Sequence, residues 1–333
     1  MPSELDSWLA LTPEVAIEPE LVICDPHHHL WVKRGYEPYL AEQFVADTTA
    51  GHRVETTVYV ECGSGYRTEG PEELRVVGES ESAARQAAEV LALGGPRIAG
   101  IVGTADLTLG DRLDDVLDAH EAAADGLFRG IRDRVIHDPT RSAFGSEVAQ
   151  PDPYRMADPA FRAGAARLGA RGLSLDVWIF HVQLEEIVDL ARAVPETTMV
   201  LNHLGGPIGV GAYKAHRDEE HARWRARMAE VAGCPNVVLK VGGHGMRMFG
   251  TGWVGAVRPP SSDEVVALWG DGMRFVIDAF GPSRCMFESN FPVDRMSFSY
   301  VVLWNAFKKV SAGFSTAERD DLMRGTATRT YRL

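Results

Sequence analysis

Short runs of apolar and β-branched residues recur along the chain and are separated by longer amphipathic or alanine-rich stretches. Eight of these runs predict β-strands, at residues 21–28, 55–63, 97–106, 127–133, 173–180, 197–205, 236–243 and 284–292. Most of the runs are nearly continuous in apolar residues, which is typical of parallel strands covered on both faces.

The stretches between these runs predict helices. They lie at residues 71–93, 113–124, 184–194, 221–233 and 261–280, and closing helices are expected at 304–310 and 315–333. Alternation of strands and helices indicates an α/β architecture with right-handed crossovers. Eight repeats favour a (β/α)8 TIM barrel formed by one domain over residues 1–333, although strand count alone is also compatible with an open doubly wound sheet.

Three segments are longer than a crossover requires: 134–158, 206–220 and 242–262. Each follows the C-terminal end of a predicted strand, which is the catalytic face of a barrel, so we expect these loops to form the walls and lid of a pocket. The third loop mixes glycines with Phe249 and Trp253, a composition suited to a mobile apolar cover.

Composition and charge narrow the classes of partner. The chain has 333 residues and a net charge of −13, which disfavours nucleic-acid binding because phosphate contacts need concentrated Lys and Arg. No apolar run approaches the roughly 20 residues of a membrane helix, and the acidic N-terminus does not resemble a secretion signal. We therefore expect a cytoplasmic protein with a small-molecule substrate, no membrane partner and possible homo-oligomers. The cysteines, Cys24, Cys62, Cys234 and Cys285, contain no CxxC pair and are expected to be reduced.

The most informative motif is Asp25-Pro26-His27-His28-His29 at the end of the first predicted strand. Side chains alternate along a strand, so His27 and His29 are expected to point the same way and His28 the opposite way. Two imidazoles that point together can supply two nitrogen ligands to one divalent cation.

This motif, continued as Leu30-Trp31, resembles the start of the metal-dependent amidohydrolases, in particular the amidohydrolase 2 branch. That branch includes sugar lactonases, pyrone-dicarboxylate lactonase and some decarboxylases. The similarity extends through FRGIRD, LDVWIFHVQL, TTMVLNHLGGP, NVVLKVGG and MFESNFPVD at the fourth to eighth predicted strands. The resemblance implies a (β/α)8 barrel, attack of water on a carbonyl and one divalent metal, zinc or manganese.

The resemblance also implies roles for further residues. His203, at the end of the sixth strand, becomes a catalytic or metal-facing histidine, and His181, after the fifth strand, becomes a further metal ligand beside His27 and His29. Trp31 is expected to contact the substrate. For both His203 and His181, a buried histidine without a catalytic role is the competing interpretation.

The eighth strand departs from the family pattern. The aspartate that would take a proton from water is replaced by Asn290, and an amide neither accepts that proton nor binds zinc well. We therefore expect Asn290 to contact the substrate. Glu288, Asp294 and Glu61 are the candidate carboxylate bases, since burial can raise the pKa of a carboxyl into a useful range.

Two basic residues at strand ends are candidates for contacts with the substrate. Arg132 and Lys240 end the fourth and seventh strands, where they could bind a substrate carboxylate or polarise its carbonyl. They could instead form buried ion pairs with the candidate carboxylates.

Three functions remain open at this point. The first is hydrolysis of a lactone or related carboxylic ester, which tolerates the loss of the aspartate better than amide hydrolysis because an alkoxide leaves more readily. The second is metal-dependent decarboxylation on the same barrel. The third is a barrel without catalytic activity that binds a small metabolite.

Overall fold

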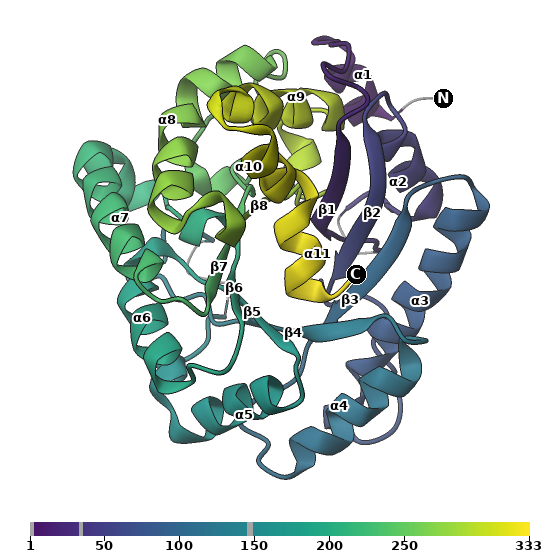
Figure 1. Cartoon of the computed structure of the whole chain (residues 1–333), viewed down its shortest axis with the longest axis vertical. Helices are drawn as coiled ribbons and strands as arrows, with labels where there is room; N and C mark the ends of the chain where they lie inside the picture. The colour runs from purple at the N-terminus through teal and green to yellow at the C-terminus, as the bar shows by residue number, and fades with distance from the viewer. Residues whose placement is uncertain (1–2, 33–35, 145–148) are drawn as a thin grey trace.

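A computed structural model of the chain describes residues 3–32, 36–144 and 149–333. Its centre is an eight-stranded parallel sheet in which the strands follow one another in sequence order (Figure 1). The strands are β1 (Val22–His28), β2 (Arg53–Val60), β3 (Arg97–Gly103), β4 (Phe128–Arg134), β5 (Ser174–Trp178), β6 (Met199–Leu201), β7 (Val237–Val241) and β8 (Cys285–Phe287). All eight predicted strands are confirmed, and only their ends differ.

Helices surround the strands (Figure 1). They are α1 (Glu4–Leu9), α2 (Ala41–Thr48), α3 (Val77–Ala92), α4 (Arg112–Ala123), α5 (Pro159–Ala170), α6 (Leu184–Ala193), α7 (Arg217–Ala232), α8 (Ser262–Phe280), α9 (Tyr300–Val310), α10 (Thr316–Asp320) and α11 (Thr326–Tyr331). The predicted helices are present, whereas α1, α2 and α5 were not predicted. Right-handed βα crossovers close the sheet into a (β/α)8 TIM barrel, which confirms the predicted fold class.

The barrel closes where the chain after β8 pairs with β1. The backbone N–H of His29 donates to the carbonyl of Phe291 at 2.7 Å, and that of Asn290 donates to the carbonyl of His27 at 2.9 Å. Asp25 reinforces this seam, because its Oδ1 accepts the backbone N–H of Ser289 at 2.9 Å. The aspartate that opens the histidine motif therefore joins the first and last strands.

The opposite, N-terminal end of the barrel is covered by the C-terminal segment. In Figure 1, α11 lies across this opening. Tyr331 is fully buried, and its hydroxyl donates to the Asp176 carboxylate, with distances of 2.8 Å and 3.0 Å to the two carboxylate oxygens. The end of the chain thus contributes to the barrel core.

The three long loops lie at the C-terminal face. Of the first, 134–158, residues 145–148 lie outside the described residues. The second includes a 3-10 turn at Gly211–His216, and the third includes another at Arg247–Phe249. All four cysteines are buried and unbridged, as expected. Within the described ranges, no helix combines the length and apolarity that a membrane span requires.

Candidate active site

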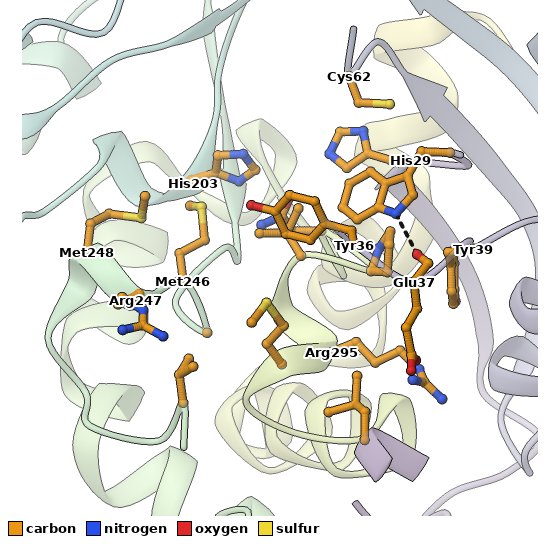
Figure 2. Close-up of a pocket in the computed structure, with 18 of the residues that line it drawn as sticks. His29, Tyr36, Glu37, Tyr39, Cys62, His203, Met246, Arg247, Met248 and Arg295 are labelled. Atoms are coloured by element: carbon orange, nitrogen blue, oxygen red, sulfur yellow. Dashed lines mark hydrogen bonds between the residues drawn. The ribbon is translucent and has the colours of Figure 1, made fainter. Parts of the chain in front are cut away.

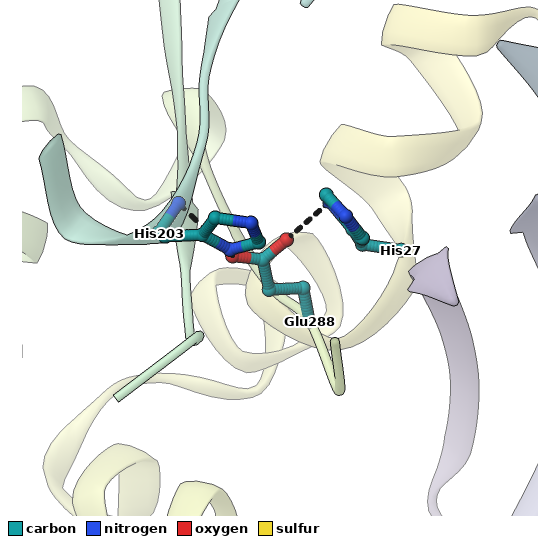
Figure 3. A group of neighbouring side chains, drawn as sticks. All are labelled: His27, His203 and Glu288. Atoms are coloured by element: carbon teal, nitrogen blue, oxygen red, sulfur yellow. Dashed lines mark hydrogen bonds and ion pairs between the residues drawn. The ribbon is translucent and has the colours of Figure 1, made fainter. Parts of the chain in front are cut away.

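Three side chains from three strand ends meet inside the barrel. His27 comes from β1, His203 follows β6 and Glu288 follows β8, and one ligand atom from each lies within 4.8 Å of the other two (Figure 3). His203 Nδ1 lies 2.7 Å from Glu288 Oε1, and His27 Nδ1 lies 2.8 Å from Glu288 Oε2. Glu288 thus connects two histidines that are 176 positions apart in the sequence.

Two glycines after β7 make room for this cluster. A Cβ on Gly242 would clash with the Glu288 side chain, and a Cβ on Gly243 would lie 2.6 Å from the His203 ring. His203 itself has a φ of 53°, and Asn290 has a φ of 54°. Left-handed backbone at residues other than glycine is costly and is concentrated at functional sites. The local backbone is therefore shaped to bring these side chains together.

The contact with Glu288 selects the tautomer of His203. The His203 ring donates from Nδ1 to the carboxylate, which leaves the lone pair on Nε2. Burial lowers the pKa of His203 below its usual 6.5, although the adjacent Glu288 carboxylate acts in the opposite direction. His203 also lines the main cavity described below. It is therefore a neutral imidazole whose Nε2 is able to accept a proton.

Basic side chains lie on both sides of His27. Arg132 Nη1 is 3.2 Å from His27 Nε2, and Lys240 Nζ is 3.3 Å from His27 Nδ1. Burial, followed by the charge of Lys240, holds the pKa of His27 well below 6.5. His27 is therefore neutral.

The expected alternation within the histidine motif is confirmed. His28 points away from the cluster and stacks on Phe44 of α2, with ring centroids 4.1 Å apart. His27 and His29 lie together, with centroids 5.0 Å apart. His29 Nδ1, however, lies 2.8 Å from the carbonyl oxygen of Val60, and His29 is not one of the three residues whose ligand atoms converge.

His181 is not brought to the cluster. Its Nε2 lies 3.1 Å from the Glu220 carboxylate on α7, and its Nδ1 accepts the backbone N–H of Ile208 at 3.3 Å. Both ring nitrogens are therefore engaged beside the β6–α7 loop. The ligand role expected for His181 has no support in this geometry, because the short turn after β5 directs the side chain outward.

The two cations expected to hold a substrate acid group are already paired. Lys240 is fully buried and donates to Asp176 Oδ2 at 2.8 Å. Arg132 Nε donates to Glu61 Oε1 at 2.8 Å. The alternative of buried ion pairs therefore describes both residues. Glu61, the partner of Arg132, is one of the candidate carboxylates, whereas Asp176, the partner of Lys240, was not among them. Lys240 is not among the residues that line the main cavity, whereas Arg132 is.

Asp294 lies behind Asn290 and not in the cavity. Its Oδ1 lies 2.8 Å from Asn290 Nδ2, and its Oδ2 accepts the backbone N–H of Gly245 at 2.9 Å. Burial raises the pKa of Asp294 well above its ordinary value. The structure therefore places Asp294 where it positions the Asn290 amide, because the loop that carries it turns into the core.

The cluster opens onto a cavity of about 1640 Å³, called the main cavity here. His29, Trp31, Arg132, His203 and Asn290, all singled out in the sequence, line it. In Figure 2, His29 and Tyr39 lie on one side, and Met246, Arg247 and Met248 lie on the opposite side. Its other walls are largely apolar, with Tyr36, Phe144, Trp178, Val254, Pro292 and Met296.

Sequence reasoning missed several of these residues. Arg134 lies two positions after Arg132 on the same strand face, so strand alternation could have indicated it. The main cavity is also lined by residues of α1, including Asp6 and Trp8. No local signal in the first ten residues relates them to a site on the barrel.

The donor set at the cluster fits a divalent metal. Two imidazole nitrogens and one carboxylate oxygen form a ligand set common for catalytic zinc. His27 and His203 are neutral, as ligands must be. Glu288 Oε2 is buried and has no hydrogen-bond partner among the described residues, since its approach to His27 lacks hydrogen-bond geometry.

The chain is similar in sequence to known proteins. A family model described as amidohydrolase matches residues 24–333. A Sinorhizobium fredii protein, y4mH, is 32% identical over 94% of this chain and 99% of its own length. An L-fucono-1,5-lactonase of Burkholderia multivorans is 29% identical over 71% of this chain and 72% of its own length.

The solved structures are similar in fold. An amidohydrolase of Burkholderia multivorans with bound HEPES is 25% identical, has a TM-score of 0.68 and covers 94% of this chain and 100% of that chain. Its zinc-bound form has a TM-score of 0.69 at 24% identity, with the same coverage. A putative 2-pyrone-4,6-dicarboxylic acid hydrolase of Pseudomonas putida has a TM-score of 0.61 at 16% identity, covering 93% of this chain and 97% of that chain.

Proposed function

Since this chain belongs to the amidohydrolase family, we propose that it hydrolyses a lactone or a related carboxylic ester by attack of an activated water at the barrel mouth. The observation that carries the proposal is the contact of Glu288 with His203, which leaves a neutral imidazole at the main cavity. The similarity to proteins named L-fucono-1,5-lactonase supports a lactone as the substrate.

His203 and Glu288 supply the proton transfers. As water attacks the carbonyl carbon, His203 Nε2 takes a proton from it, and the Glu288 carboxylate stabilises the imidazolium that forms. When the carbon–oxygen bond of the ring breaks, the imidazolium returns the proton to the leaving alkoxide. The product is the hydroxy acid, and the histidine is neutral again.

A divalent metal offers a second way to activate the water. His27, His203 and Glu288 would hold it. When bound, such an ion lowers the pKa of water and polarises a carbonyl. Zinc or manganese remains the proposed ion.

An ester suits this cavity better than an amide. Asn290 cannot act as a base, and Asp294 behind it is buried. An alkoxide leaves without the strong acid assistance that an amine requires. Trp31, Arg132 and Asn290 line the main cavity and remain the proposed substrate contacts.

Lactone opening by the purified protein tests the proposal. Acid release from L-fucono-1,5-lactone and other lactones would be followed by pH-stat, with and without added zinc or manganese. We expect Glu288→Gln to lower kcat/KM by about 100-fold or more. The surface variant Glu196→Gln should keep the activity, because Glu196 is exposed away from the cavity. Release of carbon dioxide from an aromatic acid, with no lactone opened, would identify a decarboxylase instead.

Metal analysis separates the two modes of activation. Stoichiometric zinc or manganese after purification without chelators, lost in His27→Ala, would support a metalloenzyme. Full lactonase activity after chelation would assign the water activation to His203 and Glu288 alone.

A further inference from the structure

A second, smaller cavity adjoins the main one between two loops of the catalytic face. It has a volume of about 350 Å³ and is called the side cavity here. The β6–α7 loop contributes Gly209–Gly211 and Lys214, and the β7–α8 loop contributes Arg247 and residues 250–252. Arg247 and Val254 line both cavities, so the two are adjacent.

The charged side chains of the side cavity are both cations. Lys214 and Arg247 line it, and no carboxylate does so among the described residues. Neither side chain has an ion pair or side-chain hydrogen bond within the described ranges. These two are therefore uncompensated positive charges in a chain whose net charge is −13.

The other cations around the main cavity differ in this respect. Arg132 and Arg134 are both paired with Glu61, and Arg295 is paired with Asp6 and Asp47. Their charges are neutralised by the protein. Lys214 and Arg247 are thus the cations of the two cavities that remain available for an anion.

The walls of the side cavity are held in place before any ligand binds. The backbones of Gly209 and Gly250 pack so closely that a Cβ on either would clash with the opposite loop. The Gly209 N–H also donates to the Met248 carbonyl at 2.8 Å. Next to the exposed Arg247, Met248 and Phe249 are buried and fix the turn from which the guanidinium extends. A preformed cationic cavity lowers the entropic cost of binding.

We propose that the side cavity binds a carboxylate or phosphate group at the end of the substrate remote from the scissile carbonyl. Lys214 and Arg247 bind the anion, and the main cavity holds the body of the molecule. This assignment deepens the proposed function and rests on it. The main cavity, at about 1640 Å³, exceeds the roughly 300–1,000 Å³ of typical ligand pockets, so an extended substrate fits it.

Anion binding tests the side cavity without turnover. Inorganic phosphate and succinate would be titrated into the full-length protein by isothermal calorimetry, and the stronger ligand identifies the class of anion. We expect Lys214→Gln and Arg247→Gln each to weaken binding by about tenfold or more, as for loss of a charged hydrogen bond. Arg192→Gln, which removes an exposed arginine of α6 outside both cavities, should leave binding unchanged.

Kinetics then connect the side cavity to the reaction. A lactone with a distal carboxylate would be compared with its methyl ester. In Arg247→Gln, KM should rise by about tenfold for the acid and much less for the ester. The inference would be overturned by any of three results. The first is an equal rise in KM for both substrates, and the second is an equal anion affinity in wild type and variants. The third is no anion binding by the wild type. If no lactone is hydrolysed but anion binding is still lost in the variants, the proposed function fails and the anion site stands.

Discussion

At the scale of single residues, the charged groups around His27 affect metal binding as much as the histidine itself does. Arg132 and Lys240 lie within 3.3 Å of its two ring nitrogens. A neutral imidazole has only one lone pair, so it cannot accept a hydrogen bond from both cations. Cations placed this close also repel a metal dication. This repulsion lowers the affinity of the cluster for a metal ion.

Replacing Arg132 should therefore strengthen metal binding. We expect Arg132→Met to lower the zinc Kd by about tenfold or more, because like charges a few ångströms apart repel by several kcal/mol even at an effective dielectric constant of about 20. Competition with a chromogenic chelator would measure the Kd. Arg134→Met is the matched control, since Arg134 also pairs with Glu61. Weaker zinc binding in Arg132→Met would mean that Arg132 orients His27 for the metal.

At the scale of elements, the β7–α8 loop contains a buried histidine without polar contacts. His244 is fully buried among Trp253, Trp269, Phe298 and Phe307. Neither ring nitrogen has a hydrogen-bond partner among the described residues. Burial lowers its pKa to about 3. The loop is thus packed around a group that resists protonation.

This histidine should make stability fall in acid. Below its unfolded pKa of about 6.5, the unfolded chain binds a proton that the folded chain does not, so stability is lost as pH falls from 6.5 toward 3. The loss from His244 amounts to about 2 kcal/mol at pH 5. Urea denaturation would measure the free energy of unfolding at pH 7 and at pH 5. In His244→Leu, the difference between these two free energies should be smaller by that amount. The control His216→Gln, at an exposed histidine, should leave the difference between pH 7 and pH 5 as in the wild type. An unchanged difference in His244→Leu would contradict the prediction.

Helix α1 is a second element whose role depends on its contacts. Trp8 Nε1 donates to the Ala256 carbonyl at 2.8 Å, and Arg295 connects Asp6 on α1 with Asp47 on α2. The helix therefore forms a wall of the main cavity although it precedes β1.

Removing residues 1–12 should weaken substrate binding more than catalysis. We expect KM to rise by roughly fivefold, the effect of losing a contact worth about 1 kcal/mol, with a smaller change in kcat. Steady-state kinetics would measure both, and circular dichroism would check that the barrel stays folded. Trp8→Phe, which removes the hydrogen bond to Ala256 and part of the aromatic ring but keeps the helix, should have a weaker effect. An unchanged KM in the truncated protein would exclude α1 from the binding site.

At the scale of the whole molecule, the two ends of the barrel have different tasks. The cluster and both cavities lie at the C-terminal face, whereas Tyr331 covers the N-terminal face and binds Asp176. In barrels of this kind, residues at the N-terminal face contribute to stability and those at the other face to catalysis.

A substitution at the N-terminal face should therefore separate stability from activity. Tyr331→Phe removes a hydroxyl from a buried carboxylate and should lower the free energy of unfolding by about 1–3 kcal/mol, with kcat/KM retained. Urea denaturation and lactone hydrolysis would measure the two quantities. Tyr154→Phe, at an exposed tyrosine, should change neither. Loss of activity in folded Tyr331→Phe would show that Asp176 and Lys240 transmit its effect to His27.

The sequence by itself determined the strands, most helices and the face on which the site lies. Apolar runs and helical periodicity are local properties, so the eight strands were placed to within a few residues. Alternation along one strand was enough to separate His28 from its two neighbours. Helices α1, α2 and α5 were missed because they are short or begin within polar segments.

Only the tertiary structure decided which side chains meet. The predicted ligands His27, His29 and His181 are replaced by a cluster of His27, His203 and Glu288, because barrel closure sets the distance between β1, β6 and β8. His181 points outward to Glu220. Lys240 forms an ion pair with Asp176, a partner that the sequence did not indicate. Strand alternation assigns a side chain to a face, but its partners on that face come from other strands. Those contacts depend on the stagger and closure of the whole barrel, which no local pattern encodes.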